Sequence, residues 1–215
     1  MKRIKNVQDE SRIIKNNQEK SRIMMRDSGK EFSMTVEKAV DKKVDKLRMC
    51  GVEPESIVDG PGFRYVVFVQ GCPHACPGCH NPESHDFNAG YDLSLDELMA
   101  DIERSKYLRG VTFSGGEPFC QVEGLLELAK RVKAKGLDIM SYTGYTLEEL
   151  KARKDKATDE LLDMIDILVD GRFVEAERNL TLLYRGSENQ RVIDMAKTRA
   201  SGEVVLYTNE YDVEY

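Results

Sequence analysis

The 215-residue sequence has no apolar run close to the roughly 20 residues that a membrane-spanning helix needs, and its mean hydropathy is −0.50. Its first residues hold no apolar stretch of the kind found in a secretion signal. The five cysteines are odd in number and three of them crowd into one loop, which argues against a secreted disulfide framework. These absences argue against a membrane-spanning helix and predict a soluble protein in a reducing cytoplasm.

Charge is unevenly distributed along the chain. Residues 1–48 hold 14 Lys and Arg against 8 Asp and Glu, whereas the remainder holds 18 against 30. A basic arm can contact nucleic acid, an acidic partner or the protein's own acidic body, but charged tails are usually solvated. We therefore expect residues 1–47 to form a charged extension, disordered or partly helical near 34–47, with no nucleic-acid or membrane partner. The domain proper is predicted to span residues 48–215.

Within that domain, strand-like and helix-like patterns alternate. Four short segments are predicted to be strands: 65–70, which is rich in β-branched and aromatic residues, and 110–116, 137–144 and 166–171. Helical patterns separate them, and two start at capping boxes, Ser94 with Glu97 and Thr146 with Glu149. The first helix is expected to continue through Tyr107. Further helical patterns cover 122–132 and 158–165.

Alternating strands and helices imply right-handed crossovers and a mostly parallel sheet. About four such units are too few for a full eight-unit barrel. We expect an α/β fold with a partial (β/α) barrel and a mostly parallel open sheet. Ligands bind at the carboxyl ends of strands in such folds, so the turns that follow the four strands should lie on one rim and form one site.

Three cysteines, Cys72, Cys76 and Cys79, lie within the string CPHACPGCH directly after the first of these strands. A [4Fe-4S] cluster normally takes four thiolates, so a tight group of three suggests a cluster with one iron open to a substrate. Cys50 and Cys120 are the other candidates for a fourth thiolate. The alternative is a zinc site, completed by Cys120 or by a histidine. The candidate histidines are His74, His80 and His85.

The string SGGEP at 114–118 ends the next predicted strand. Its glycines allow the backbone to approach a ligand closely, and Glu117 can pair with an ammonium group. Alone this turn is a weak signal, because such a string is often only a loop before a helix. Its position after the strand that follows the cysteine loop places it where a ligand on an open iron would extend.

These motifs resemble those of the radical S-adenosylmethionine superfamily, whose mark is CxxxCxxC with a later GGE turn. The wider set is similar to the family of anaerobic ribonucleoside-triphosphate reductase activating proteins. The resemblance covers roughly residues 48–195 and none of 1–47. It rests on four segments: EPESIVDGPGFRYVVFVQGCPHACPGCHNPESHDF at 53–87, YTGYTLEEL at 142–150, ILVDGRF at 167–173 and RGSENQR at 185–191.

The resemblance implies a role for particular residues. Cys72, Cys76 and Cys79 would hold one [4Fe-4S] cluster, with no catalytic side chain beyond the cluster and S-adenosylmethionine. The residues expected at the S-adenosylmethionine site are Gly78, Cys79, His80, Gly116 and Glu117, with Glu117 beside the amino group. Many superfamily members have an aromatic residue where this chain has Gly78, so His80 or Phe119 could contribute contacts to adenine. The turn at 59–62 and the YTGY turn at 142–145 could border the ligand or only support the fold.

The implied activity is that of an oxidoreductase that cleaves S-adenosylmethionine reductively to a 5′-deoxyadenosyl radical and so generates a glycyl radical on anaerobic ribonucleoside-triphosphate reductase. The implied partners are the glycyl-radical subunit of that reductase and an electron donor such as a flavodoxin or ferredoxin. Two alternatives stay open. One is an activase of another glycyl-radical enzyme of the formate-lyase type, against which the short chain and RGSENQR argue. The other is a non-catalytic zinc-binding interaction module.

Overall fold

The computed structural model describes residues 22–27, 30–35 and 44–208, and its contacts divide the chain into units 1–43 and 44–215. In the first unit, β1 (Arg22–Asp27) pairs antiparallel with β2 (Lys30–Thr35). The helix expected near 34–47 is wrong at both ends, because its first residues belong to β2 and its last to a strand of the second unit. Residues 36–43 lie outside the described residues.

The second unit is built on a seven-stranded sheet with the order β5-β3-β4-β6-β7-β8-β9. The four central strands are parallel to one another: β4 (Phe63–Val69), β6 (Leu108–Gly115), β7 (Asp138–Tyr142) and β8 (Ile167–Asp170). The outer strands run antiparallel to their neighbours: β3 (Lys46–Ser56), β5 (Tyr91–Ser94) and β9 (Arg191–Asp194). The α/β class and the parallel core are confirmed, and the described sheet is open, with β5 and β9 at its edges.

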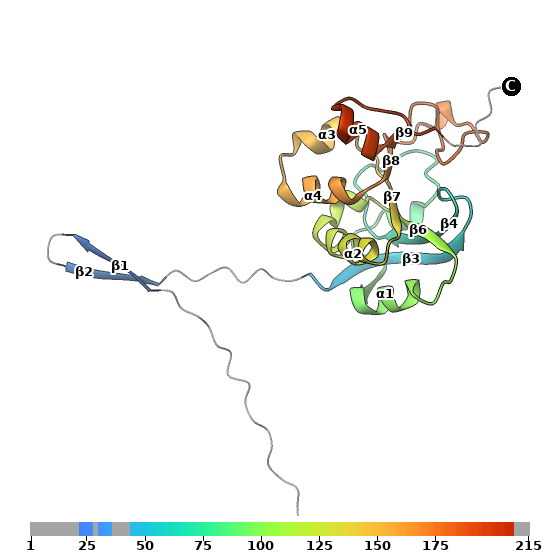
Figure 1. Cartoon of the computed structure of the whole chain (residues 1–215). Helices are drawn as coiled ribbons and strands as arrows, with labels where there is room; N and C mark the ends of the chain where they lie inside the picture. The colour runs from blue at the N-terminus through green and yellow to red at the C-terminus, as the bar shows by residue number, and fades with distance from the viewer. Residues whose placement is uncertain (1–21, 28–29, 36–43, 209–215) are drawn as a thin grey trace, which may run out of the picture. The chain divides into compact units, whose positions relative to one another are not determined.

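Five helices connect or follow these strands: α1 (Leu95–Ile102), α2 (Val122–Ala134), α3 (Leu147–Ala152), α4 (Lys156–Met164) and α5 (Met195–Ser201). Both predicted capping boxes are formed, at the start of α1 and of α3. The first helix is shorter than expected, because α1 ends at Ile102 and Tyr107 is 80% exposed. Helices α2 and α4 lie next to each other on the same side of the sheet (Figure 1).

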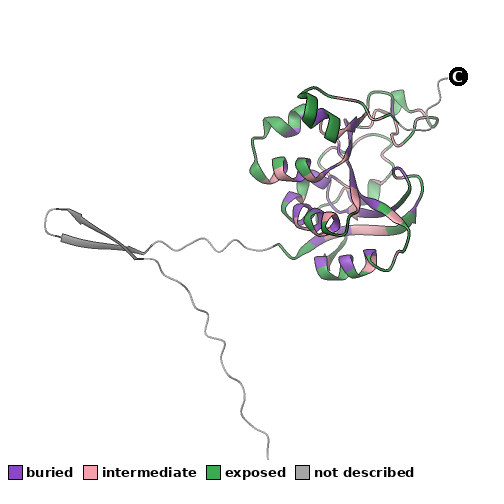
Figure 2. Cartoon of the chain, in the orientation of Figure 1, coloured by how far each residue is buried: buried purple, intermediate pink, exposed green. Residues whose placement is uncertain are grey.

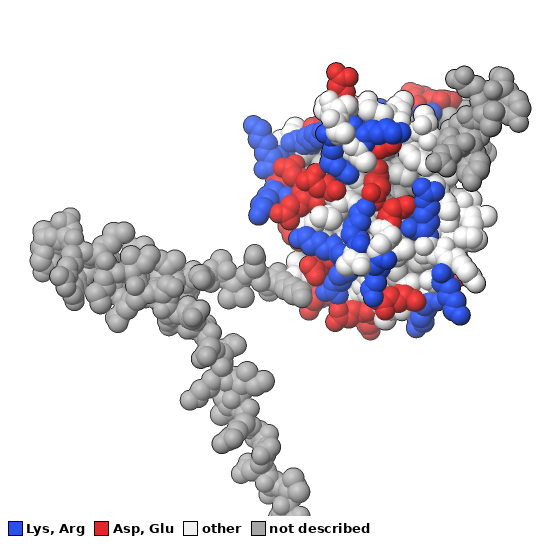
Figure 3. Space-filling model, in the orientation of Figure 1, with Lys and Arg blue, Asp and Glu red and all other residues white. Residues whose placement is uncertain are grey.

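The core lies between the sheet and these helices (Figure 2). Along the parallel strands, Val67, Phe113 and Leu168 are fully buried, and α2 contributes Leu125 and Leu128 to the same cluster. Strands that are buried on both faces have nearly continuous apolar sequences. This pattern explains why the central strands could be predicted from the sequence. Over the surface that Figure 3 shows, Lys and Arg side chains are interspersed with Asp and Glu.

A buried arginine braces the segment that enters the first parallel strand. Arg64 is 0% exposed, and its guanidinium donates to the Thr112 hydroxyl at 3.0 Å and to the Val111 carbonyl at 2.8 Å, and pairs with Asp138. The Thr112 hydroxyl in turn donates to the Asp59 carbonyl at 2.8 Å. This bonding ties the turn at 59–62 to the sheet, which favours a supporting role for most of that turn.

Candidate active site

A cavity of about 430 Å³ lies where the loops after the four parallel strands meet. All three clustered cysteines line it, together with the SGGEP turn, the turn after β7 and the turn after β8. Residues from those turns that line it include Ser114, Gly115, Gly116, Thr143 and Gly171. The prediction that these turns form one site is therefore confirmed in its geometry, as expected for the carboxyl ends of parallel strands.

The cysteine loop is held by its own backbone. The Gly71 amide donates to the Ser84 carbonyl at 2.8 Å, and the Cys72 amide donates to the His85 carbonyl at 3.1 Å. Gly71 has φ +97°, and a Cβ there would lie 2.4 Å from the Phe87 ring, so the loop requires glycine at this point. The loop that leaves β4 therefore returns on itself and presents its thiols to the cavity.

The three thiols are half-buried and face one space. Burial raises the pKa of the Cys72 thiol. In the part of the chain that the structure describes, no three His, Cys, Asp or Glu side chains are close enough together to hold a single metal ion. Three cysteine thiols are the donor set that a [4Fe-4S] cluster with one open iron requires. Neither Cys50 nor Cys120 is among the residues that line the cavity.

The SGGEP turn lies directly against the segment that leads into Cys72. The Gly116 amide donates to the Val69 carbonyl and the Glu117 amide donates to the Gly71 carbonyl, both at 2.8 Å. A Cβ on Gly116 would lie 2.4 Å from the Gly71 carbonyl oxygen. The glycine is thus required by the close approach of two backbones, and the two loops form one continuous wall of the cavity.

The Glu117 carboxylate is buried and bonded to four groups of the chain. Its Oε1 accepts from the Phe119 amide at 2.9 Å and from the Thr143 hydroxyl at 3.0 Å. Its Oε2 accepts from the Gly144 amide at 2.8 Å and lies 2.9 Å from Nε2 of His74. The carboxylate therefore joins the SGGEP turn, the turn after β7 and the cysteine loop, a contact set that the sequence did not predict.

Of the residues expected at the S-adenosylmethionine site, four line the cavity: Cys79, His80, Gly116 and Glu117. Gly78 is not in the lining; it has φ +68° and faces the Glu175 side chain. The His80 ring packs against Phe173, with centroids 5.1 Å apart. Phe119, considered for adenine contact, is instead 3% exposed in the hydrophobic core. It is buried within the turn Pro118–Cys120 and is not among the residues that line the cavity.

The RGSENQR segment borders the same cavity. Gln190 accepts hydrogen bonds from the amides of Gly186 and Ser187 and donates to the Gly171 carbonyl at 3.0 Å. Arg185, Gly186 and Gln190 all line the cavity. The segment is therefore fixed to the turn after β8, and the same turn contributes Phe173, an aromatic cavity residue to which the sequence analysis gave no role.

Comparison with known proteins places this site in a family. The family model described as "4Fe-4S single cluster domain" matches residues 58–193. The anaerobic ribonucleoside-triphosphate reductase-activating protein of Escherichia coli (strain K12) is 40% identical over 147 residues, which is 65% of this chain and 93% of that protein. The protein of the same name from Enterobacteria phage T4 is 35% identical over 150 residues, which is 66% of this chain and 90% of the phage protein. The chain belongs to this family of activating proteins.

For a member of this activating-protein family, the matched 4Fe-4S domain decides between the cluster and the zinc site in favour of the cluster. The matched residues contain all four turns that meet at the cavity. The solved structure of QueE from Escherichia coli aligns over 47% of this chain and 53% of the QueE chain, with 21% sequence identity and a TM-score of 0.38. This similarity is too low to bear on the fold. No helix among the described residues has the length and apolar character to cross a membrane.

Proposed function

We propose that this protein is a radical S-adenosylmethionine enzyme that generates a glycyl radical on anaerobic ribonucleoside-triphosphate reductase. One observation carries the proposal: three thiols without a fourth share one cavity with a glycine-rich turn from the next parallel strand. Relatives of 35–40% identity over at least 90% of their own length bear the name of that activity. The proposed scaffold is a partial (β/α) barrel around the parallel strands β4, β6, β7 and β8.

In this proposal Cys72, Cys76 and Cys79 hold the [4Fe-4S] cluster and leave one iron without a protein ligand. A bound, reduced cluster would supply the single electron that cleaves the sulfonium of S-adenosylmethionine to methionine and a 5′-deoxyadenosyl radical, and that radical would take a hydrogen atom from a glycine Cα of the reductase. The chain's own residues orient the reactants and exclude water. His80 and Gly116 line the cavity beside the thiols, which supports their assignment to the S-adenosylmethionine site.

The partner's glycine must reach the cavity from outside. Val58 lines the cavity and is 71% exposed, and Ile57 beside it is 68% exposed. Exposed apolar side chains at the edge of a cavity are suited to contact with a protein partner. We propose that the reductase approaches this edge. An electron donor of the flavodoxin or ferredoxin class and a cytoplasmic location complete the proposal.

The test is an anaerobic incubation of the reconstituted full chain with S-adenosylmethionine, a reductant and the purified glycyl-radical subunit of the reductase. Electron paramagnetic resonance should show a glycyl-radical doublet, and the matched Cys76→Ala variant should give none. A doublet on a formate-lyase-type enzyme but not on the reductase would favour the other activase. A colourless protein with one zinc per chain and no cleavage of S-adenosylmethionine would reject catalysis altogether.

A further inference from the structure

His74 lies between Cys72 and Cys76 in the sequence. Its side chain contacts Glu117 in the SGGEP turn and Tyr145 in the turn after β7. Its exposure is 4%, and that of the Glu117 side chain is 1%. The Nε2 atom of His74 lies 2.9 Å from Oε2 of Glu117. Because a carboxylate can only accept, His74 donates its Nε2 proton in this contact. The cysteine loop is thus bonded to the SGGEP turn through side chains as well as through the backbone.

The Glu117 carboxylate has no acceptor capacity left for a ligand. A carboxylate offers about four lone-pair positions, and the structure supplies two donors to each oxygen. Two of these donors are the backbone amides of Phe119 and Gly144. An incoming ammonium group would have to displace one of these donors and leave it buried without a partner, which is costly.

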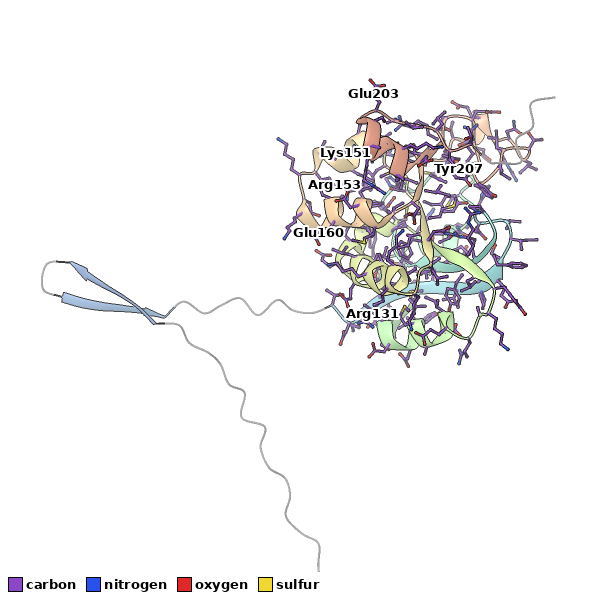
Figure 4. All side chains as sticks on the ribbon, viewed as in Figure 1. Arg131, Lys151, Arg153, Glu160, Glu203 and Tyr207 are labelled. Carbon is purple, nitrogen blue, oxygen red and sulfur yellow. The ribbon has the colours of Figure 1, made fainter. Side chains whose placement is uncertain are left out.

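The packing around His74 is equally specific. The Tyr145 ring meets the His74 ring edge-on, with centroids 4.4 Å apart. Arg153, which follows α3 and is labelled in Figure 4, lies 4.1 Å over the Tyr145 ring and donates to the Phe119 carbonyl at 3.1 Å. A Cβ on Gly144 would lie 2.3 Å from Cδ2 of His74. The imidazole therefore occupies a fitted position between the turn after β7 and the SGGEP turn.

We propose that Glu117 and His74 are positioning residues that hold the cysteine loop in its cluster-binding conformation, and that the Glu117 carboxylate does not bind the amino group of S-adenosylmethionine. This inference rests on the proposed function and replaces the ligand role that the motif implies for Glu117. The carboxylate fixes the relative position of three turns, and His74 transmits that position to the segment between Cys72 and Cys76. The cluster ligands are then preorganised by contacts within the chain.

The decisive variant is Glu117→Gln, which retains the shape but offers only one acceptor oxygen to four donors. Two readouts separate the roles. The first is hydrogen exchange of the amides at 71–80 in the full chain before reconstitution, together with its iron content afterwards. The second is the dissociation constant of the S-adenosylmethionine analogue that lacks the amino group, divided by the dissociation constant of S-adenosylmethionine itself. A carboxylate that bound the ammonium directly would contribute roughly tenfold or more to that ratio.

We expect Glu117→Gln to expose the loop amides and lower iron content, with the ratio for cluster-bearing protein staying within about twofold of the wild-type value, since no direct contact is lost. Unchanged exchange and full iron content, with the ratio falling to one, would overturn the inference. The exchange readout needs no cluster. If the wild-type chain bound no iron but the variant still exposed the loop, the proposed function would fail while the positioning role held.

Three further variants guard against simple misfolding. Gly144→Ala leaves the carboxylate in place and pushes the His74 ring away, so it should expose the loop amides and lower iron content as His74→Leu does. His74→Gln, which can still donate to Glu117, should retain more iron than His74→Leu. The matched control is Gly51→Ala, because a Cβ at Gly51 meets no atom within 4 Å. Wild-type loop exchange in Gly144→Ala would contradict the proposed fit around His74.

Discussion

Adding one methyl group at Gly116 should separate the two loops that form the cluster-side wall of the cavity. In Gly116→Ala the new Cβ would lie 2.4 Å from the Gly71 carbonyl oxygen and 3.0 Å from that of Ser84. These are backbone atoms, so no flexible side chain can yield. Ordinary contact begins at about 3.4 Å, and the loops must therefore move apart by about 1 Å.

A 1 Å separation stretches the 2.8 Å bond from the Glu117 amide to the Gly71 carbonyl beyond hydrogen-bond range. Losing that bond and straining the packing should together lower the free energy of unfolding by roughly 2–4 kcal/mol. For a chain of this size the melting temperature should then fall by roughly 4–16 °C. A 1 Å misplacement of reacting groups can reduce rates by about 10²-fold, so cleavage of S-adenosylmethionine should fall by about that factor at temperatures where the variant is still folded.

The assays are thermal unfolding by circular dichroism and the release of 5′-deoxyadenosine by the reconstituted enzyme. Gly51→Ala is again the matched control, since it adds the same methyl group into open space. The control should melt and react like the wild type. If Gly116→Ala does so as well, the close approach of the SGGEP turn to the cysteine loop has no functional importance and the reasoning is refuted.

Four further predictions concern single side chains and the extension. Cys76→Ala should lose the cluster and all cleavage of S-adenosylmethionine, whereas Cys120→Ala should keep its iron because this thiol does not line the cavity. Iron and sulfide analysis checks both variants. A Cys120→Ala protein without iron would show that four thiolates, including Cys120, hold the cluster. Arg64→Met should lower the free energy of unfolding in urea by about 2–4 kcal/mol, because it removes a buried cation from its partners. Arg104→Met, which removes an exposed ion pair with Asp101, should lower the free energy of unfolding by less than about 1 kcal/mol. Equal losses of stability in the two arginine variants would contradict the importance of burial at Arg64. Burial raises the pKa of the Cys120 thiol to about 11, and the neighbouring Glu117 carboxylate and Cys72 thiol act in the same direction. The rate at which iodoacetamide alkylates Cys120 before reconstitution, measured by mass spectrometry, should therefore keep rising until the pH approaches 11. A rate that levels off by pH 9 would contradict the raised pKa. Removing residues 1–33 should spare cleavage, and a collapse in activity would show that the extension contributes to the reaction.

The central strands and the rim were predictable because each carries a local signal. Buried parallel strands appear as short apolar runs, and the capping boxes at Ser94 and Thr146 mark the helix starts that the structure contains. Glycines and cysteines at the strand ends then point to one site. These signals depend on residues close together in the chain, so no knowledge of distant contacts is needed to recognise them.

The parts that the sequence analysis missed depend on distant contacts. Strand β3 contains Gly51 and Pro54, and its pairing with β4 has register shifts, so no regular alternation marks it. The contact between His74 and Glu117 joins residues 43 positions apart, and nothing in either motif predicts it. Phe119 is one of two residues that could have contacted adenine, but it lies in a short helical turn and is part of the hydrophobic core.

The most direct test of the central claim is the electron paramagnetic resonance spectrum of the anaerobically reconstituted, reduced full chain, recorded before and after adding S-adenosylmethionine. The account predicts the signal of one reduced [4Fe-4S] cluster, which changes when the ligand reaches the iron that no cysteine occupies. A cluster signal that S-adenosylmethionine leaves unchanged would contradict the open iron, and a protein that binds no iron would contradict the proposed function.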